Sequence, residues 1–187
     1  MKFQSKGVRQ TKNIASNLAK KVIKNSLQQH AQAFALEGEL GAGKTTFVKG
    51  FAGAFGIKSR ITSPTFVLLK GYRLPRVASQ RGKQVTGYRF LYHIDAYRLK
   101  NYHDLIPLGI KEIMADPRNI VLIEWSDRVK KILPSKYIKV HIDHIGIKTR
   151  KITINNIYGP PSLKLRKGTS SPKEEMLALR SSGGAKK

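Results

Sequence analysis

The feature that most constrains this chain is the stretch GELGAGKTT at residues 38–46, which fits the phosphate-binding pattern G-x-x-x-x-G-K-[ST]. A short apolar run, residues 32–37, meets this stretch directly, and residues 45–55 are able to form a helix. The order matters because the backbone N–H groups of the loop and the positive end of the following helix must both point at the phosphates. The sequence therefore predicts an α/β fold that contains a P-loop.

Each residue type in this loop has a physical role. Three glycines let the backbone curl without Cβ clashes, Lys44 is expected to reach the β and γ phosphates of a nucleotide, and the Thr45 hydroxyl is expected to ligate Mg²⁺. The alternative is a chance match in a glycine-rich turn, against which the preceding strand and following helix argue. The loop alone does not identify the reaction, because many unrelated activities share it.

Two acidic residues close predicted strands. A P-loop needs an acid to complete its metal site, usually at the end of a neighbouring apolar strand. Glu124 ends the run IVLIE in this way, although an ordinary surface carboxylate is the alternative. Asp95 ends the run FLYHID and could orient an attacking water or hold the metal through water. His93 lies on the same face of that strand as Asp95, and a lone histidine is more often structural than catalytic.

Further candidates lie beside these strands. Ser63 and Thr65 flank Pro64 before a predicted strand, and their hydroxyls could reach a phosphate, the metal or a water. As a bare tripeptide, this segment is only a turn signal. Trp125 directly follows Glu124, and its position in the sequence, taken alone, favours a packing role for its side chain.

Net charge is the most informative feature of the composition. Lys and Arg number 36 against 11 Asp and Glu, the net charge is +25, and Glu37 is the first acidic residue. Such an excess attracts polyanions, and the alternative is that it is a bulk property of the protein or of its ends. The chain has no cysteine, which excludes disulfides and thiolate metal sites and fits a reducing compartment.

The length and hydropathy of the chain limit the class of protein to which it can belong. At 187 residues we expect one domain of the usual size. No run approaches the roughly 18 apolar residues of a membrane span, and the first residues lack the apolar core of a secretory signal. These features predict a soluble, cytoplasmic protein that does not enter a membrane.

Periodicity predicts the remaining elements. Thr11 to Lys24 is expected to be an amphipathic helix with Thr11 at its cap. We expect strands over residues 65–70, 88–95, 119–125, 137–143 and 148–155, with the last two antiparallel, and helices over 104–114 and, shorter, 129–133. The basic segment 72–89 is predicted to be a long hairpin loop within a P-loop domain of residues 1–158. Residues 159–187 are predicted to be a basic, disordered tail.

Taken together and in order, the segments GELGAGKTTFVKGF, SPTF, LYHIDAYRL, LGIKE and VLIEW resemble the TsaE family, also called YjeE. The resemblance covers about residues 11–154 and is more specific than the P-loop, because it includes the pattern HxDxYR and a Glu-Trp pair. It implies a three-layer, P-loop NTPase-like α/β fold whose parallel core sheet is extended by antiparallel strands.

The resemblance also implies a function. TsaE-like proteins are bacterial P-loop ATPases that act with TsaB and TsaD, alongside TsaC-type enzymes. The pathway forms N6-threonylcarbamoyladenosine next to the anticodon of tRNAs that read codons beginning with A. ATP and Mg²⁺ are the implied cofactors, and the TsaB and TsaD complex, not the ATPase, transfers the threonylcarbamoyl group.

Carried over residue by residue, the resemblance gives Lys44 and Thr45 phosphate and magnesium roles, Glu124 the second magnesium contact and Asp95 the acid needed for hydrolysis. Ser63, Thr65 and Trp125 resemble a switch-like segment beside the site. The implied ATP-binding residues are Thr11, Glu39, Leu40, Gly41, Ala42, Gly43, Lys44, Thr45, Thr46 and Arg150. Glu39 stands where the family often has Asp, and the segment 74–87 and the tail are longer than the family leads us to expect.

Three hypotheses follow. The first is a Mg²⁺-dependent ATPase with water as acceptor, slow when isolated because no arginine finger is obvious; Arg98 or a partner group could supply one. The second is a small-metabolite kinase; such kinases generally need a lid with arginines, and the loop 72–89 could be mistaken for one. The third is a non-catalytic RNA-binding accessory. In the first, tRNA is contacted through the protein complex and the basic surface.

Overall fold

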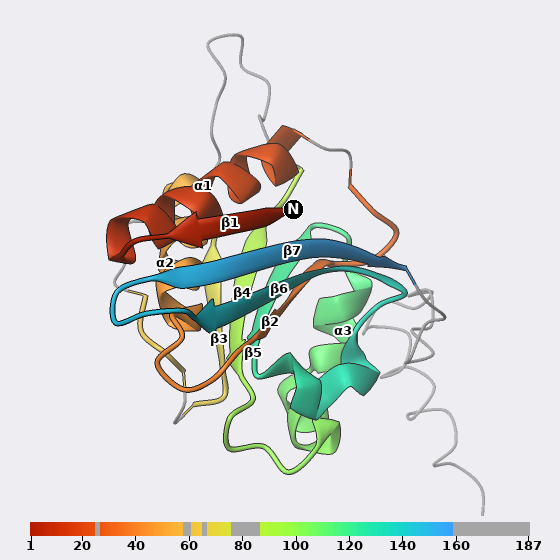
Figure 1. Cartoon of the computed structure of the whole chain (residues 1–187). Coiled ribbons are helices and arrows are strands. Elements are labelled where there is room, and N and C mark those ends of the chain that lie inside the picture. Colours follow the sequence, from red (N-terminus) through yellow and green to blue (C-terminus); the bar gives the residue numbers. More distant parts are fainter. Residues whose placement is uncertain (25–26, 58–60, 65–66, 76–86, 159–187) are drawn as a thin grey trace, which may run out of the picture.

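The computed structural model describes residues 1–24, 27–57, 61–64, 67–75 and 87–158. Seven strands form one sheet in the order β1-β7-β6-β2-β5-β4-β3 (Figure 1). Their bounds are β1 (Lys2–Ser5), β2 (Gln32–Glu37), β3 (Leu69–Arg73), β4 (Phe90–Asp95), β5 (Asn119–Glu124), β6 (Lys136–His144) and β7 (Arg150–Tyr158).

The sheet has a parallel centre and antiparallel edges. β2 pairs in parallel with β5 and β6, and β4 pairs in parallel with β5. On one side β7 and β1 add antiparallel strands, and on the other side β3 does the same. The predicted parallel core with antiparallel extensions is confirmed.

Helices cover both faces of the sheet and make three layers (Figure 1). The helices α1 (Val8–Lys24) and α2 (Lys44–Ala54) pack on one face, whereas the 3₁₀ helices η1 (Tyr102–Leu108) and η2 (Ser126–Ile132) and the helix α3 (Ile110–Ala115) pack on the other. β2 shows why this works, because Phe34 and Leu36 join one core while Ala33 and Ala35 join the other. A central parallel strand is buried on both faces in this way.

Several predicted elements needed correction. β1 was not predicted, and α1 begins at Val8, so Thr11 lies in the first turn and is not the cap. The single helix expected over 104–114 is divided into η1 and α3 by Gly109, whose φ is 72°, after a proline in η1. The strand expected over 65–70 begins later, at Leu69. Both strands that flank the basic loop still begin and end within a few residues of their predicted bounds.

Parts of two predictions lie outside the described residues. The hairpin is confirmed by the antiparallel pairing of β3 and β4, but most of its loop, residues 76–86, lies outside them. The tail, residues 159–187, does so as well. Over the part of the chain that the structure describes, none of the helices is both long and apolar enough to cross a bilayer.

Candidate functional site

Backbone conformation and backbone hydrogen bonds determine the shape of the loop between β2 and α2. α2 begins at Lys44 with Gly43 as its N-cap, and the Phe47 N–H donates to the Gly43 carbonyl oxygen at 2.9 Å. Gly38 has a φ of +136°, and a Cβ on it would lie 2.3 Å from the backbone oxygen of Ile142 in β6. Only glycine fits so close to a neighbouring strand. The loop leads into the N-terminal end of α2, and a helix N-terminus is suited to binding an anion.

Lys44 lies at the base of this loop and is 5% exposed. Its Nζ donates to the carbonyl oxygens of Gly38, at 2.6 Å, and Glu39, at 2.9 Å. The same Nζ lies 3.7 Å from the ring centroid of Trp125, which is a close cation–π contact. The backbone of the loop and one aromatic ring therefore hold the ammonium where the glycine-rich turn closes.

The surroundings of Lys44 act on its pKa in opposite directions. Burial lowers the pKa of the ammonium from its ordinary value, whereas the charges of Glu124, Asp95 and Asp127 oppose that effect. The cation thus lies in a desolvated position that faces three acids, where electrostatic interactions are stronger than in water.

Thr45 and Glu124 form a hydroxyl–carboxylate pair. The Thr45 Oγ1 donates to Glu124 Oε2 at 3.0 Å, and the other carboxylate oxygen, Oε1, lies 2.8 Å from His93 Nε2. His93 is fully buried and Glu124 is 3% exposed. Because His93 engages one oxygen of the carboxylate, the other is held facing the start of α2.

Asp95 lies beside this pair, since the register of β4 and β5 sets it opposite Glu124. It is 4% exposed, accepts a hydrogen bond from Ser63 Oγ on one oxygen, and accepts from the Tyr97 N–H at 3.1 Å on the other. The structure therefore brings Ser63 to Asp95, a contact that sequence reasoning did not predict. Thr65 lies outside the described residues.

Trp125 turns the chain away from the end of β5. Its φ is 58°, it directly precedes η2, and its ring centroid lies 5.0 Å from that of Tyr97. Since a positive φ is uncommon in a residue other than glycine, this conformation is imposed by its surroundings. Trp125 thus lines the site through its contact with Lys44. It also packs partly against the core on the face of the sheet that α3 covers.

Thr11 and Arg150 are joined through Ser5, which sequence reasoning missed. Thr11 Oγ1 and Ser5 Oγ lie 2.8 Å apart, and β1 pairs with β7 so that Ser5 faces Arg150. Arg150 Nε then donates to the carbonyl oxygen of Ala42 at 3.1 Å. Thr11 thus bonds to a residue of β1 whose register partner in β7, Arg150, bonds to the loop.

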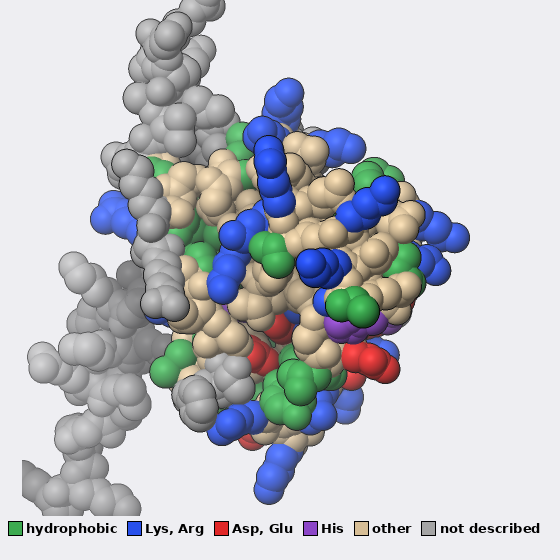
Figure 2. All heavy atoms as spheres, turned by 60° about the vertical axis from the view of Figure 1, so that its left-hand side comes forward, with side chains coloured by type: hydrophobic (Ala, Val, Ile, Leu, Met, Phe, Trp, Pro, Cys, Tyr) green, Lys and Arg blue, Asp and Glu red, His purple; other side chains and the backbone are tan. Residues whose placement is uncertain are grey.

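The remaining loop residues differ in exposure. Leu40 is 74% exposed at the tip of the loop, whereas Ala42 is buried beneath it. Figure 2, which brings the left-hand side of Figure 1 forward, shows Lys and Arg side chains spread over this face and a few acidic side chains gathered in its lower half. An exposed apolar tip in such a surface is available to another molecule.

The donor set fits a nucleotide with Mg²⁺. A hydroxyl beside a carboxylate offers the hard oxygen ligands that Mg²⁺ prefers, and this ion is usually bound by one or two such ligands plus phosphates rather than by a protein cage. Consistently, no group of three His, Cys, Asp or Glu side chains able to hold a metal occurs among the described residues. The arrangement suits phosphoryl chemistry, in which positioning and charge stabilisation do most of the work.

Comparison with known proteins gives a consistent picture. The model of a family described as "Threonylcarbamoyl adenosine biosynthesis protein TsaE" matches residues 5–152. A Bacillus subtilis protein named "tRNA threonylcarbamoyladenosine biosynthesis protein TsaE" is 31% identical over 157 residues, which are 84% of this chain and 86% of that protein. A Treponema pallidum protein of the same name is 35% identical over 68% of this chain and 84% of its own length. The crystal structure of Bacillus subtilis YdiB superposes with a TM-score of 0.61 at 28% identity, over 97% of this chain and 93% of that one.

Proposed function

Because the chain belongs to the TsaE family, we propose that it is a Mg²⁺-dependent ATPase that supports the formation of N6-threonylcarbamoyladenosine in tRNA. The phosphoryl acceptor is water, and the protein partners are TsaB and TsaD. The relatives are named for threonylcarbamoyladenosine biosynthesis in tRNA, and the observation that carries the ATPase part is the Thr45–Glu124 pair at the start of α2.

The proposal divides the work among four side chains. When bound, Mg²⁺ would neutralise charge that develops on the transferred phosphoryl group. Thr45 and Glu124 would hold this ion, and Lys44 would stabilise the β and γ phosphates. Asp95 accepts hydrogen bonds from Ser63 and from the backbone of Tyr97, which supports its role as the carboxylate that orients the attacking water.

Hydrolysis by the isolated protein is expected to be slow. Among the described residues, Lys44 is the cation that we assign to the phosphates, and the tip of its loop is exposed at Leu40. A partner that docks there could add a positive charge and exclude water. We expect turnover well below about 10 per second, the median for enzymes, until the partner proteins are added.

The test is reconstitution of tRNA modification with TsaB, TsaD and a TsaC-type enzyme, under conditions that need many turnovers of the complex. Lys44→Ala, Glu124→Ala and Asp95→Ala should each stop repeated modification and ATP hydrolysis together. Normal repeated modification by a hydrolysis-deficient Asp95→Ala protein would contradict the proposal and favour a non-catalytic RNA-binding role.

The same reaction separates an ATPase from a small-metabolite kinase. An ATPase releases ADP and free phosphate in equal amounts, whereas a kinase leaves the phosphoryl group on an acceptor. Phosphate release that falls short of ADP formation, together with a labelled acceptor from [γ-³²P]ATP, would therefore overturn the choice of water.

A further inference from the structure

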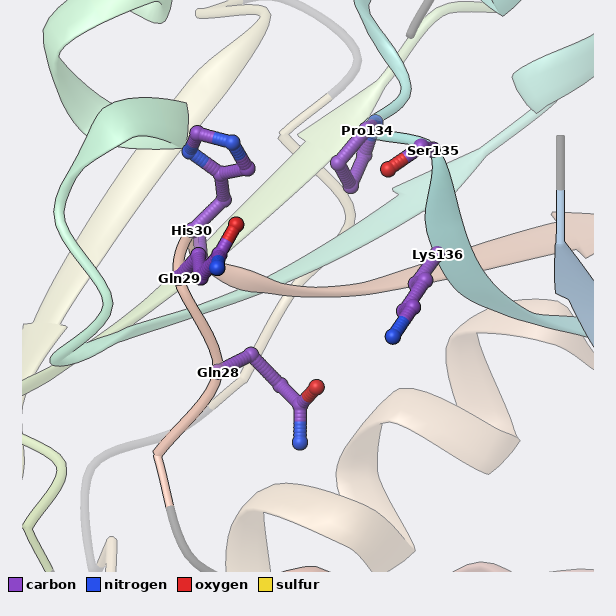
Figure 3. A pocket seen from close by; sticks show the side chains of 7 residues that line it. Gln28, Gln29, His30, Pro134, Ser135 and Lys136 are labelled. Atoms are coloured by element: carbon purple, nitrogen blue, oxygen red, sulfur yellow. The ribbon is translucent and has the colours of Figure 1, made fainter. Parts of the chain in front are cut away.

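A polar groove lies at the end of the sheet opposite the P-loop. Its larger hollow, of about 300 Å³, is bounded by the segment before β2 and the start of β6 (Figure 3). A smaller hollow of about 150 Å³ adjoins it and extends across β6 to the end of β7. Gln28 and Lys136 line both hollows, so we treat the two as one groove.

The groove is far from the candidate ATP site. Gln32, the first residue of β2, lines the groove, whereas the P-loop follows the last residue of the same strand. Six residues of strand span about 20 Å. A ligand in the groove therefore would not contact the nucleotide site.

Carboxamides are the commonest polar side chains in the lining. Gln28, Gln29, Gln32 and Asn156 each present one acceptor oxygen and two donor hydrogens. This combination is the one that pairs with the edges of nucleobases. Unpaired RNA displays those edges, whereas an RNA duplex hides them.

A lysine and a tyrosine lie side by side at the open end of the groove. The register of β6 and β7 places Lys136 opposite Tyr158, so both side chains lie on the same face of the sheet. Lys136 Nζ lies 6.0 Å from the ring centroid of Tyr158, and this ring is 70% exposed. An exposed ring on which a base can stack, next to a cation for its phosphate, is a typical arrangement for single-stranded nucleic acid.

The charge of the groove narrows the choice of ligand. None of the described residues that line it is acidic, and Lys136 adds a positive charge. Among the described lining residues there is thus no carboxylate to attract a basic peptide. In a chain of net charge +25, it fits an anionic ligand that also carries hydrogen-bonding edges.

His30 also lines the larger hollow (Figure 3). Its imidazole adds one more hydrogen-bonding side chain to the lining.

From these observations we infer that the groove binds an unpaired nucleotide of single-stranded RNA, with the base stacked on Tyr158 and read by the carboxamides, and the phosphate next to Lys136. The inference deepens the proposed role in tRNA modification by giving the protein its own RNA contact. It does not depend on ATP hydrolysis, so the two can fail separately.

The binding test uses the full chain and a fluorescein-labelled single-stranded RNA of about eight nucleotides, followed by fluorescence anisotropy. Tyr158→Ala should weaken binding at least about fivefold, the lower limit for loss of one base stack, while Tyr158→Phe should bind like the natural protein. Equal binding by the natural protein and Tyr158→Ala would overturn the inference, as would no binding by the natural protein.

The salt dependence tests the cation. Lys136→Gln should reduce the slope of log affinity against log salt by about 0.7, as expected for one phosphate contact in a single strand. Lys148→Gln, at the opposite end of the β6–β7 hairpin, is the matched control and should leave the slope nearly unchanged. Equal changes for the two lysines would show bulk attraction only and overturn the site.

A measurement without mutation completes the test. In ¹H–¹⁵N spectra, single-stranded RNA should shift the side-chain NH₂ signals of Gln28, Gln29, Gln32 and Asn156, and a duplex of the same length should shift them much less. If inorganic phosphate at the same concentration shifts them as strongly, the groove is an anion site only, and base recognition is wrong. Lys44→Ala should bind the RNA normally, which separates this result from failure of the ATPase proposal.

Discussion

The polar groups at the two ends of β2 differ in burial and in their bonding partners. At the P-loop end Lys44, Asp95 and Glu124 are buried, and other groups of the protein bind each of them. At the groove end Gln28 and Lys136 are exposed. Buried and connected groups are pre-organised for charge stabilisation, while exposed long side chains can adapt to more than one ligand.

The largest expected effect comes from removing the buried cation. Lys44→Ala should lower ATP hydrolysis by about 100- to 1000-fold, the usual cost of losing one group that stabilises transition-state charge. Phosphate release per protein molecule is the measurement, with partner proteins present. Lys136→Gln at the groove end should leave hydrolysis unchanged, and a similar loss in both variants would abolish the distinction between the two ends.

The next effect concerns the packing of α2, which carries Lys44. A Cβ on Gly50 would lie 2.5 Å from backbone atoms of Lys12 in α1, whereas Gly53 in the same helix has nothing within 4 Å of such an atom. Gly50→Ala should therefore lower the free energy of unfolding by about 1 to 3 kcal/mol, and Gly53→Ala should raise it by about 0.5 to 1 kcal/mol. Urea denaturation measures both, and equal effects would mean that the helices do not cross so closely.

His93 should act on Mg²⁺ through Glu124. His93→Ala frees one oxygen of the carboxylate, so we expect about tenfold weaker Mg²⁺ binding in the presence of ATP, the lower end for loss of a group that orients a ligand. Fluorescence of Trp125, the only tryptophan in the chain, can report the titration.

His93→Gln is the conservative control for this prediction, because its amide nitrogen can approach the position of the histidine Nε2. It should recover most of the Mg²⁺ affinity. A purely structural role would instead lower stability in both variants and leave the Mg²⁺ titration of the folded protein unchanged.

The smallest effect is expected from a partly exposed carboxylate, that of Asp116, at the groove end of the sheet. Hydrogen bonds from Arg118 lower the pKa of the Asp116 carboxyl below its ordinary value, against a partial desolvation. The folded state thus binds this proton less well than the unfolded state. The resulting stability is present above the ordinary pKa and is lost as pH falls through the lowered one.

Asp116→Asn should therefore cost a few tenths of a kcal/mol at neutral pH, as for other exposed pairs, and nothing in strong acid. Urea denaturation at pH 7 and at a pH below the lowered pKa of Asp116 compares the two conditions. A cost that is the same at both pH values would assign the effect to the turn itself and not to the charge.

Local patterns predicted much of this architecture. The apolar run of β2 and the switch to a helix after the loop are confirmed, and so is the antiparallel pair that became β6 and β7. β1 was missed because KFQS is short and mostly exposed, so it shows no clear alternation. The kink between η1 and α3 was missed because the apolar spacing continues through Gly109.

The site was harder to predict than the elements. Sequence reasoning selected Glu124 and Asp95 as acids at strand ends, but it gave His93 only a structural role and did not find Ser5. Both of these residues contact partners on neighbouring elements, and no local pattern identifies the partner. A signal did exist for His93, since it alternates with Asp95 along one strand and is therefore on the same face.

By itself, the sequence determined that a strand, a glycine-rich loop and a helix follow one another, that acids close two other strands, and that the chain is strongly basic. Only the tertiary structure decided which groups meet. Thr45 and Glu124 are 79 residues apart, and they touch because β2 and β5 are parallel neighbours whose carboxyl ends share one edge. Periodicity selects the face on which a side chain lies, but the order of strands in the sheet selects its neighbours.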